Sequence, residues 1–416
     1  MTDASLQQNL QHASRTLNSA VELTAEFKRE LKAIGDWWTS HAFDEEAGGF
    51  YGEVRADNTP IKDANKGIVL NTRILWFFSE AAMATDAPEY RAAATRAYDY
   101  LIQYFFDKEF GGVYWELDAR GNPLNTKKQT YAQAFAIYAL CSYYKLTSDE
   151  QALTHAMDCF ALLEEKTIDR KKEGYFEAFT REWGKMDDVR LSDKDLNYPK
   201  SMNTHLHVLE AYTVLHKTKP GKDVHGALRY NIDCFDKYLI DKNTWHLRMF
   251  LTEDWQDFSP GLTYGHDIEC SWLLSKALDS LGDAELTAAM TPAIINIAKV
   301  TLEEGIGEHG EVIDAYDFAS QKKLTERVWW VQAEALVGFL NAYCLSGETA
   351  YFDAAKNVWA FIQQYQIDHD KGEWLWLSRL DEHHGEDNYK MGFWKGPYHN
   401  GRAMLEAIRY LKRFEH

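Results

Sequence analysis

The chain carries one sequence unit six times, and this internal repeat restricts the possible folds more than any other feature. Each copy joins an acid-rich turn to a short run of alternating aromatic residues and a second turn. The copies begin at Asp44, Asp107, Asp169, Asp241, Glu308 and His369. Their glycines stand at 49, 112, 174, 310 and 372, so the period is near 63 residues, and the fourth unit, around Trp245, is the least regular. A repeat of this length predicts an architecture built by packing copies of one supersecondary unit.

Each unit has the same order of predicted elements: an amphipathic helix, the hairpin, and a helix that is apolar on nearly all sides. Residues 90–106 and 350–366 are examples of the amphipathic helix. The apolar helices begin near residues 71, 130, 203, 266, 329 and 398. A helix that is apolar all round is buried, whereas a one-sided helix lies outside. The pattern predicts an all-α fold, an (α/α)6 barrel with short β-hairpins at its mouth, as a single catalytic domain over residues 1–416.

Composition excludes several classes of partner. The 416 residues carry a formal net charge of −19, which argues against nucleic acid and anionic membranes as partners. No apolar run reaches the ~18 residues of a membrane span, and the N-terminus lacks the pattern of a secretion signal. The five cysteines are odd in number and scattered, which predicts reduced thiols and a cytoplasmic location. The 14 tryptophans suit a sugar-binding cleft as well as a core.

The predicted barrel gathers the N-terminal ends of its six inner helices around one mouth, because these helices all run in the same direction. Polar and aromatic residues of their first turns should therefore meet in space. These residues are Arg73, Tyr131, Asn203, His207, His266, Glu269, Trp329, Trp330, Glu334, His399 and Arg402. Buried charges cost several kcal/mol unless they are paired, so a functional site is the favoured explanation.

Structural interpretations of single residues remain open. His207, His266 and His399 could be hydrogen-bonded core histidines, and the tryptophan pair could be core. Arg73 could pair with a buried acid such as Glu334. His205 lies two residues from His207, so it points elsewhere and is predicted to be structural. His205 and His207 could also be two ligands of a metal site. No third ligand stands at a clear spacing from them, so we expect no metal.

Six segments resemble the N-acylglucosamine 2-epimerase superfamily, and within it the cellobiose 2-epimerase branch. They are "VLNTRILWFF", "TYAQAFAIYAL", "SMNTHLHVLEAY", "YGHDIECSWLL", "WWVQAEALVGFLNAY" and "GFWKGPYHNGR". The resemblance extends from about Leu31 to Leu411 and touches all six inner helices. It implies an (α/α)6 barrel, in agreement with the repeat.

The resemblance also implies an activity: inversion of C2 of the reducing-end glucose of β-1,4-linked disaccharides, without a cofactor. Cellobiose would become glucosyl-mannose, and lactose would become epilactose. The C2 proton is acidic only in the open-chain aldehyde, so the ring must open first. Removal of the proton gives an enediolate, whose oxyanion needs positioned donors. Reprotonation of the opposite face requires two acid/base groups, each with a pKa near neutrality, and histidine is the natural choice.

By this resemblance, His266 and His399 are the acid/base pair. His207, Arg73 and Asn203 match positions that bind the O1/O2 region, and His207 or His399 assists ring opening. Further matches are Tyr131 and Asp195 as substrate contacts, Trp329 and Trp394 as platforms for the sugar rings, and Glu269 and Glu334 as groups that orient the histidines and arginines. The expected partner is a disaccharide, and the expected state is a monomer or weak homodimer.

Three other functions fit parts of the pattern. A glycoside hydrolase would need two carboxyl groups ~5 to 9.5 Å apart, with Glu269, Glu334, Asp195 and Asp267 as candidates. An N-acylglucosamine 2-epimerase or a mannose/glucose isomerase of the same superfamily would share the enediolate and differ in substrate or in the carbon that is reprotonated. A toroidal interaction scaffold is the non-enzymatic alternative, and the convergence of histidine, arginine and glutamate argues against it.

Overall fold

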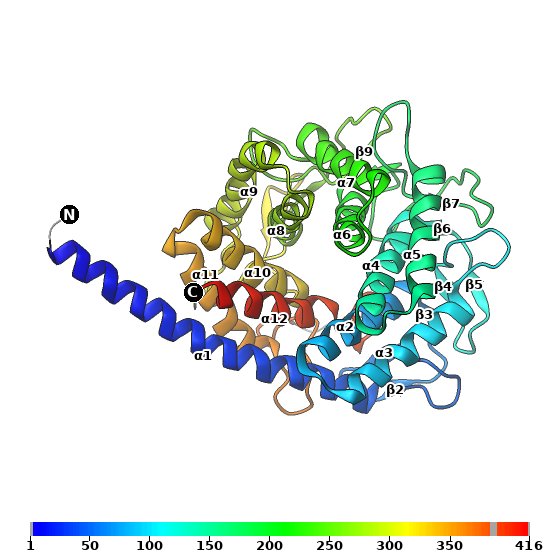
Figure 1. Cartoon of the computed structure of the whole chain (residues 1–416), viewed down its shortest axis with the longest axis horizontal. Helices are drawn as coiled ribbons and strands as arrows, with labels where there is room; N and C mark the ends of the chain where they lie inside the picture. The colour runs from blue at the N-terminus through cyan, green and yellow to red at the C-terminus, as the bar shows by residue number, and fades with distance from the viewer. Residues whose placement is uncertain (1–2, 383–388, 415–416) are drawn as a thin grey trace.

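The computed structural model, which describes residues 3–382 and 389–414, is a barrel of two concentric rings of helices (Figure 1). In the described residues the inner ring is α2 (Ile68–Thr85), α4 (Thr130–Thr147), α6 (Met202–Thr218), α8 (Tyr264–Leu281), α10 (Trp329–Ser346) and α12 (Tyr398–Leu411). The outer ring is α1 (Asp3–His41), α3 (Pro88–Tyr100), α5 (Glu150–Leu162), α7 (Lys222–Cys234), α9 (Ala284–Glu304) and α11 (Thr349–Phe361). The predicted (α/α)6 barrel is confirmed. Inner helices are buried on nearly every side, as their sequences indicate.

Four outer helices end in a five-residue π-helical turn. These turns are η1 (Leu101–Phe105), η2 (Leu163–Thr167), η3 (Phe235–Leu239) and η4 (Ile362–Gln366). With them, the observed helical segments match the predicted spans 90–106 and 350–366 closely. Because the same turn recurs in four units, it belongs to the repeat and leads the chain into each hairpin. A final 3-10 turn, η5 (Lys412–Phe414), follows the last inner helix.

Short strands join each unit to the next at the barrel mouth. They are β1 (Glu53–Arg55), β2 (Pro60–Ile61), β3 (Lys66–Gly67), β4 (Glu116–Leu117), β5 (Pro123–Asn125), β6 (Lys128–Gln129), β7 (Ala178–Phe179), β8 (Lys200–Ser201), β9 (Phe250–Leu251), β10 (Gly261–Thr263), β11 (Ala315–Asp317), β12 (Lys322–Leu324) and β13 (Tyr389–Met391). The strand before an inner helix pairs antiparallel with the hairpin of the following unit, as β3 does with β4. Strand β1 pairs with β13, which places Val54 opposite Met391 and closes the ring.

The first turn of the irregular fourth hairpin closes with the same backbone hydrogen bond as that of the second. The amide of Asp107 donates to the carbonyl of Gly112 at 2.9 Å, and Asp241 donates to His246 at 3.0 Å. The residue before that acceptor is left-handed, with φ of 72° at Gly111 and 65° at Trp245. The fourth unit therefore keeps the turn although it lost the glycine, and its backbone accepts the left-handed conformation in a non-glycine residue.

A buried lysine–aspartate pair fastens the hairpin turn of each of the first three units to the start of its inner helix. Their Nζ–Oδ2 distances are 2.7 Å for Lys66–Asp44, 2.9 Å for Lys128–Asp107 and 2.9 Å for Lys200–Asp169. Each lysine stands two residues before its inner helix and is buried. Arg327 and Glu311 form the corresponding pair of the fifth unit at 2.7 Å. These ion pairs connect the hairpin turns at the barrel mouth to the starts of the inner helices.

The inner helices supply most of a continuous apolar core. Among the described residues, no helix combines the length and the apolar character that crossing a membrane requires. The N-terminal part of α1 extends beyond the ring in Figure 1, whereas its C-terminal part packs beside α12.

We expect Lys66→Met to lower the free energy of unfolding by about 3 kcal/mol, because it leaves the buried Asp44 carboxylate without its cation. The matched control is Lys32→Met, which breaks the exposed Lys32–Asp36 pair and should cost less than ~1 kcal/mol. Urea unfolding followed by circular dichroism measures both. Equal effects of the two substitutions would contradict a structural role of the buried pair.

Candidate functional site

A cavity of about 460 Å³ opens at the N-terminal ends of the inner helices, and we call it the main cavity. Residues from all six inner helices line it, together with the loop between β7 and β8 and the segment before α12. The predicted residues that line it are Arg73, Tyr131, Asp195, Asn203, His207, His266, Glu269, Trp329, Trp330, Trp394 and His399. Glu334 and Arg402 lie buried beneath this lining. The structure thus brings together side chains more than 300 residues apart in sequence.

Arg73 presents a cation to the main cavity and is held from two sides. Its guanidinium donates to the Tyr131 hydroxyl at 3.0 Å and to the carbonyl of Trp394. The alternative pairing of Arg73 with Glu334 is wrong, because Arg402 contacts that carboxylate instead. The charge of Arg73 therefore faces the cavity and is not neutralised by this acid.

Arg402 is the centre of a buried ionic cluster under the cavity floor. Its Nη2 donates to Oε1 of Glu269 at 2.6 Å and to Oε1 of Glu334 at 2.7 Å, and Nη1 contacts the Glu210 carboxylate. The Tyr398 hydroxyl also donates to Glu210, at 2.6 Å. Three acids thus share one guanidinium, whose planar fork reaches all of them.

The three acids of this cluster do not titrate alike. Burial raises the pKa of Glu210, but Arg402 and His207 lower it more, and it falls to about 2. Burial and the neighbouring Glu334 hold the pKa of Glu269 well above its ordinary value. The pKa of Glu334 is also raised by burial, so Glu269 and Glu334 both differ in direction from Glu210.

Three histidines line the main cavity, and the Nδ1 atom of each is already engaged. His399 Nδ1 lies 2.7 Å from Oε1 of Glu334, and His207 Nδ1 lies 3.0 Å from Oε2 of Glu210. His266 Nδ1 instead contacts the hydroxyl of Thr263 at 2.7 Å. The Nε2 atoms are the ring nitrogens left for chemistry.

The pKa values of the paired histidines differ from the near-neutral values expected from sequence. Burial lowers the pKa of His266 to about 3, with a further contribution from His207. Burial, Arg73 and Arg402 hold the pKa of His399 well below its ordinary range. Both rings are therefore neutral at pH 7 and can accept a proton, and an anion formed between them would raise their pKa values.

Aromatic rings form the walls beside these imidazoles. The Trp330 ring packs near both imidazoles, with its centroid 4.7 Å from that of His266 and 5.6 Å from that of His399. Trp329 packs on Trp376 at 4.2 Å. Flat apolar faces beside polar groups are typical of sugar sites, where ring C–H groups lie against aromatic rings.

Four carboxyl groups were candidates for a hydrolase. Glu269 and Glu334 are bound to Arg402, and Asp195 accepts from the amide of Ser192 at 2.8 Å and from its hydroxyl at 2.9 Å. Asp267 contacts His246 at 2.7 Å and does not line the main cavity. His205, predicted to be structural, contacts the Ser201 carbonyl at 2.7 Å and accepts from Tyr175.

Sequence reasoning missed several residues of the site, among them Glu210, Trp376, Tyr389 and Tyr398. Trp376 and Tyr389 line the main cavity from the sixth hairpin, whereas Glu210 and Tyr398 belong to the buried cluster. Glu210 could have been found, since it is a single acid in an apolar helix, three residues after His207. The alternation of the sixth hairpin gave no signal that distinguishes Trp376 from its core neighbours.

Glu269, Glu334 and His399 also offer ligand atoms that lie within 4.8 Å of one another, close enough to suggest a metal site. Nη2 of Arg402 lies between the two carboxylates and donates to both. A metal ion at this position would meet a fixed positive charge, so the donor set is better suited to the guanidinium.

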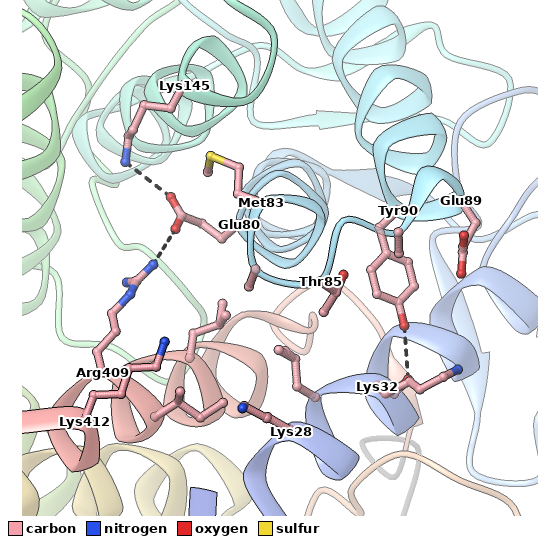
Figure 2. A pocket seen from close by; sticks show the side chains of 15 residues that line it. Lys28, Lys32, Glu80, Met83, Thr85, Glu89, Tyr90, Lys145, Arg409 and Lys412 are labelled. Carbon is pink, nitrogen blue, oxygen red and sulfur yellow. Dashed lines mark hydrogen bonds and ion pairs between the residues drawn. The ribbon is translucent and has the colours of Figure 1, made fainter. Parts of the chain in front are cut away.

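A further cavity, of about 860 Å³, lies near the opposite, C-terminal ends of α2, α4 and α12. Figure 2 shows Glu80 in contact with Lys145 at 3.2 Å and with Arg409 at 2.9 Å. The residues that line this cavity include no histidine. The main cavity is therefore the better candidate site.

The sequence profile of the N-acylglucosamine 2-epimerase (GlcNAc 2-epimerase) family matches residues 49–401. The chain belongs to the N-acylglucosamine 2-epimerase family. The resemblance seen in the six inner-helix segments is thereby confirmed.

Individual relatives within this family are similar over nearly the whole chain. A cellobiose 2-epimerase of Bacteroides fragilis is 42% identical over 387 residues, which cover 93% of this chain and 98% of the relative. A cellobiose 2-epimerase of Ruminococcus albus is 39% identical and covers 88% of this chain and 93% of its own. The structure of cellobiose 2-epimerase from Bacillus thermoamylovorans superposes with a TM-score of 0.88 at 36% identity, covering 93% of this chain and 98% of its own.

We expect Glu334→Gln to lower kcat by about 100-fold with little change in KM, because the uncharged amide no longer supports a positive charge on His399. The matched control is Glu326→Gln, which changes an exposed acid shortly before the same helix and should leave both constants unchanged. Steady-state kinetics measure the effect. Wild-type kcat in Glu334→Gln would contradict the pairing of these two residues in the reaction.

We expect activity to survive prolonged treatment with EDTA, because Arg402 supplies the positive charge between Glu269 and Glu334. Turnover after dialysis, with and without added divalent cations, measures this. A strong loss that Zn²⁺ or Mn²⁺ restores would contradict the expectation that the site needs no metal.

Proposed function

We propose that the main cavity epimerises C2 of the reducing-end glucose of β-1,4-linked disaccharides. Cellobiose becomes glucosyl-mannose, and lactose becomes epilactose. The observation that carries the proposal is the pair of buried, neutral imidazoles of His266 and His399, which line one cavity and both pack near Trp330. The similarity to cellobiose 2-epimerases over nearly the whole chain supports the substrate class.

The reaction begins with opening of the reducing-end ring, because the C2 proton becomes acidic only beside a free aldehyde. His207 or His399 assists this step. Proton removal then places negative charge on O1 and O2 of the enediolate. Arg73 and Tyr131 are already oriented by their mutual hydrogen bond at 3.0 Å, so they stabilise this charge without rearrangement, and Asn203 binds the same region.

Inversion requires one base on each face of the enediolate. One of His266 and His399 removes the C2 proton, and the other delivers a proton to the opposite face. The two rings differ in the hydrogen-bond partner of Nδ1: His399 contacts the Glu334 carboxylate, whereas His266 contacts a threonine hydroxyl. The Glu334 carboxylate thus gives His399 an acidic hydrogen-bond partner that His266 lacks at its Nδ1 atom.

The remaining lining residues hold the disaccharide. Trp329 and Trp394 offer platforms for the reducing-end ring and its neighbour, and Asp195 contacts sugar hydroxyls from the loop between β7 and β8. Glu269 and Glu334 position the arginine and histidine groups from below.

The ion pairs of the floor weigh against a hydrolase. Glu269 and Glu334 both bind Arg402, so neither is a free acid at the sugar linkage. The alternative within the family is an N-acylglucosamine 2-epimerase or a mannose/glucose isomerase, which shares the enediolate and takes a single sugar. We place the enzyme in the cytoplasm, in keeping with its five free cysteines, and as a monomer or weak homodimer.

One incubation tests the function: the protein with cellobiose, lactose, glucose, mannose or N-acetylglucosamine in D2O, followed by NMR. We expect glucosyl-mannose and epilactose, with deuterium at C2. Released glucose from cellobiose would establish a hydrolase instead. Conversion of the monosaccharides alone would favour the isomerase alternative.

The same assay tests the two bases. We expect His266→Ala and His399→Ala each to abolish epimerisation and to lose exchange of the C2 proton with solvent deuterium, because each face of the enediolate needs its own base. A His205→Ala variant is the histidine control outside the main cavity, judged after its folding has been checked by circular dichroism. Wild-type exchange in either His266→Ala or His399→Ala would refute the two-base assignment.

A further inference from the structure

A second, smaller cavity is lined by His266 and by the loop that joins β7 to β8; we call it the side cavity. Its volume is about 40 Å³, and its wall includes Glu177, Asn203, Arg190 and Tyr198. His266, Asn203 and Asp195 line both this cavity and the main one. The His266 ring is therefore part of a wall between the two spaces.

Two buried polar atoms on this wall have no hydrogen-bond partner among the described residues of the protein: Oε1 of Glu177 and Oδ1 of Asn203. Glu177 is 4% exposed, and its other oxygen accepts from the Thr204 hydroxyl at 2.7 Å. A buried polar atom that lacks a partner costs about 1–3 kcal/mol unless water satisfies it. An ordered water needs roughly 10–15 Å³ and polar partners, so the side cavity is large enough for water, and these two oxygens offer it acceptors.

We propose that Glu177 is a positioning residue that exchanges protons with His266 through ordered water in the side cavity. The inference rests on the proposed function. It assigns a role to an acid that does not line the main cavity and to a space that the substrate does not need.

A two-base reaction requires each histidine to return to its starting protonation state after a turnover. After His266 takes a C2 proton, its Nε2–H bond must break before the next cycle in that direction. The bridging water accepts this proton and passes one of its own to the Glu177 carboxylate, where an O–H bond forms. The carboxyl group later releases a proton to solvent through the same water. Nothing is oxidised or reduced, and charge moves only as a proton.

Glu177 has the acidity that this role needs. Burial raises its pKa to about 7, with a smaller contribution from the charge of Asp195, while the hydroxyls of Thr204 and Ser201 act in the opposite direction. Arg190 and Tyr198 are the other ionisable groups that line the side cavity from the loop. The carboxylate accepts a proton only above its pKa, so turnover supported by Glu177 rises with pH through neutrality.

The decisive variant is Glu177→Gln, since the amide oxygen still accepts from Thr204 but the group cannot carry the proton. We expect kcat for cellobiose to fall about ten-fold at pH 8, KM to stay within about two-fold, and the rise of kcat around pH 7 to disappear. The matched control is Glu182→Gln, an exposed acid five residues further along the same hairpin, which should behave as wild type.

Isotope exchange separates this role from a structural one. The reaction is run in D2O, and the deuterium at C2 of the recovered substrate is measured. The ratio of this deuterium to the fraction of substrate converted reports how readily the abstracting base exchanges its proton with solvent. We expect this ratio to fall in Glu177→Gln in only one direction, either from cellobiose or from glucosyl-mannose, because His266 abstracts in only one. A general structural defect would slow both directions and leave both ratios unchanged.

A second variant tests the pH dependence by shifting it. Thr204→Val removes a hydrogen bond that favours the Glu177 carboxylate, so the rise of kcat should move to higher pH. A Glu177→Gln enzyme with the wild-type pH profile and wild-type exchange ratios would overturn the inference and leave the epimerase proposal intact. Failure of the wild-type protein to epimerise cellobiose would instead refute the proposed function.

Discussion

The contact of one guanidinium with three buried acids is the interaction on which the site depends. Arg402 bridges Glu210 on α6, Glu269 on α8 and Glu334 on α10, while it stands itself on α12. Four inner helices are thereby joined at one level of the barrel. Removing the cation would leave several acids in a space of low dielectric, which is far more costly than losing one surface pair. The cluster is therefore both a structural tie and the floor of the main cavity.

The same cluster determines what the histidines can do. Glu334 and Glu210 each contact a cavity histidine as well as Arg402, so the acids that hold the barrel also fix two imidazole rings. His266 lacks such an acid at its Nδ1, and this asymmetry makes the side cavity and Glu177 relevant to it. Burial keeps the rings neutral until an anion forms between them. The arrangement thus favours proton transfer to and from carbon over the carboxyl chemistry of a hydrolase.

Much of the fold could be predicted from the sequence, because a 63-residue period and two kinds of helix leave few closed arrangements. The helix starts were predicted within a few residues. Most residues predicted on the first turns line the main cavity, because inner helices that run in parallel present them together, whereas Glu334 and Arg402 lie beneath it. The pairing of Arg73 with Glu334 was wrong. Both arginines lie in apolar helices, and the sequence alone does not show which of them reaches the acid.

The sequence by itself determined the barrel, the family and the gathering of histidine, arginine and tryptophan at one mouth. Periodicity and residue type suffice for this, because they fix which face of each helix is buried. Only the tertiary structure decided the partners: Glu334 for His399, a threonine for His266, and Arg402 as the common cation. Those pairings depend on side-chain directions across different helices, and so do the pKa values and the side cavity beside Glu177. Spacing along one helix carries no information about distances between helices.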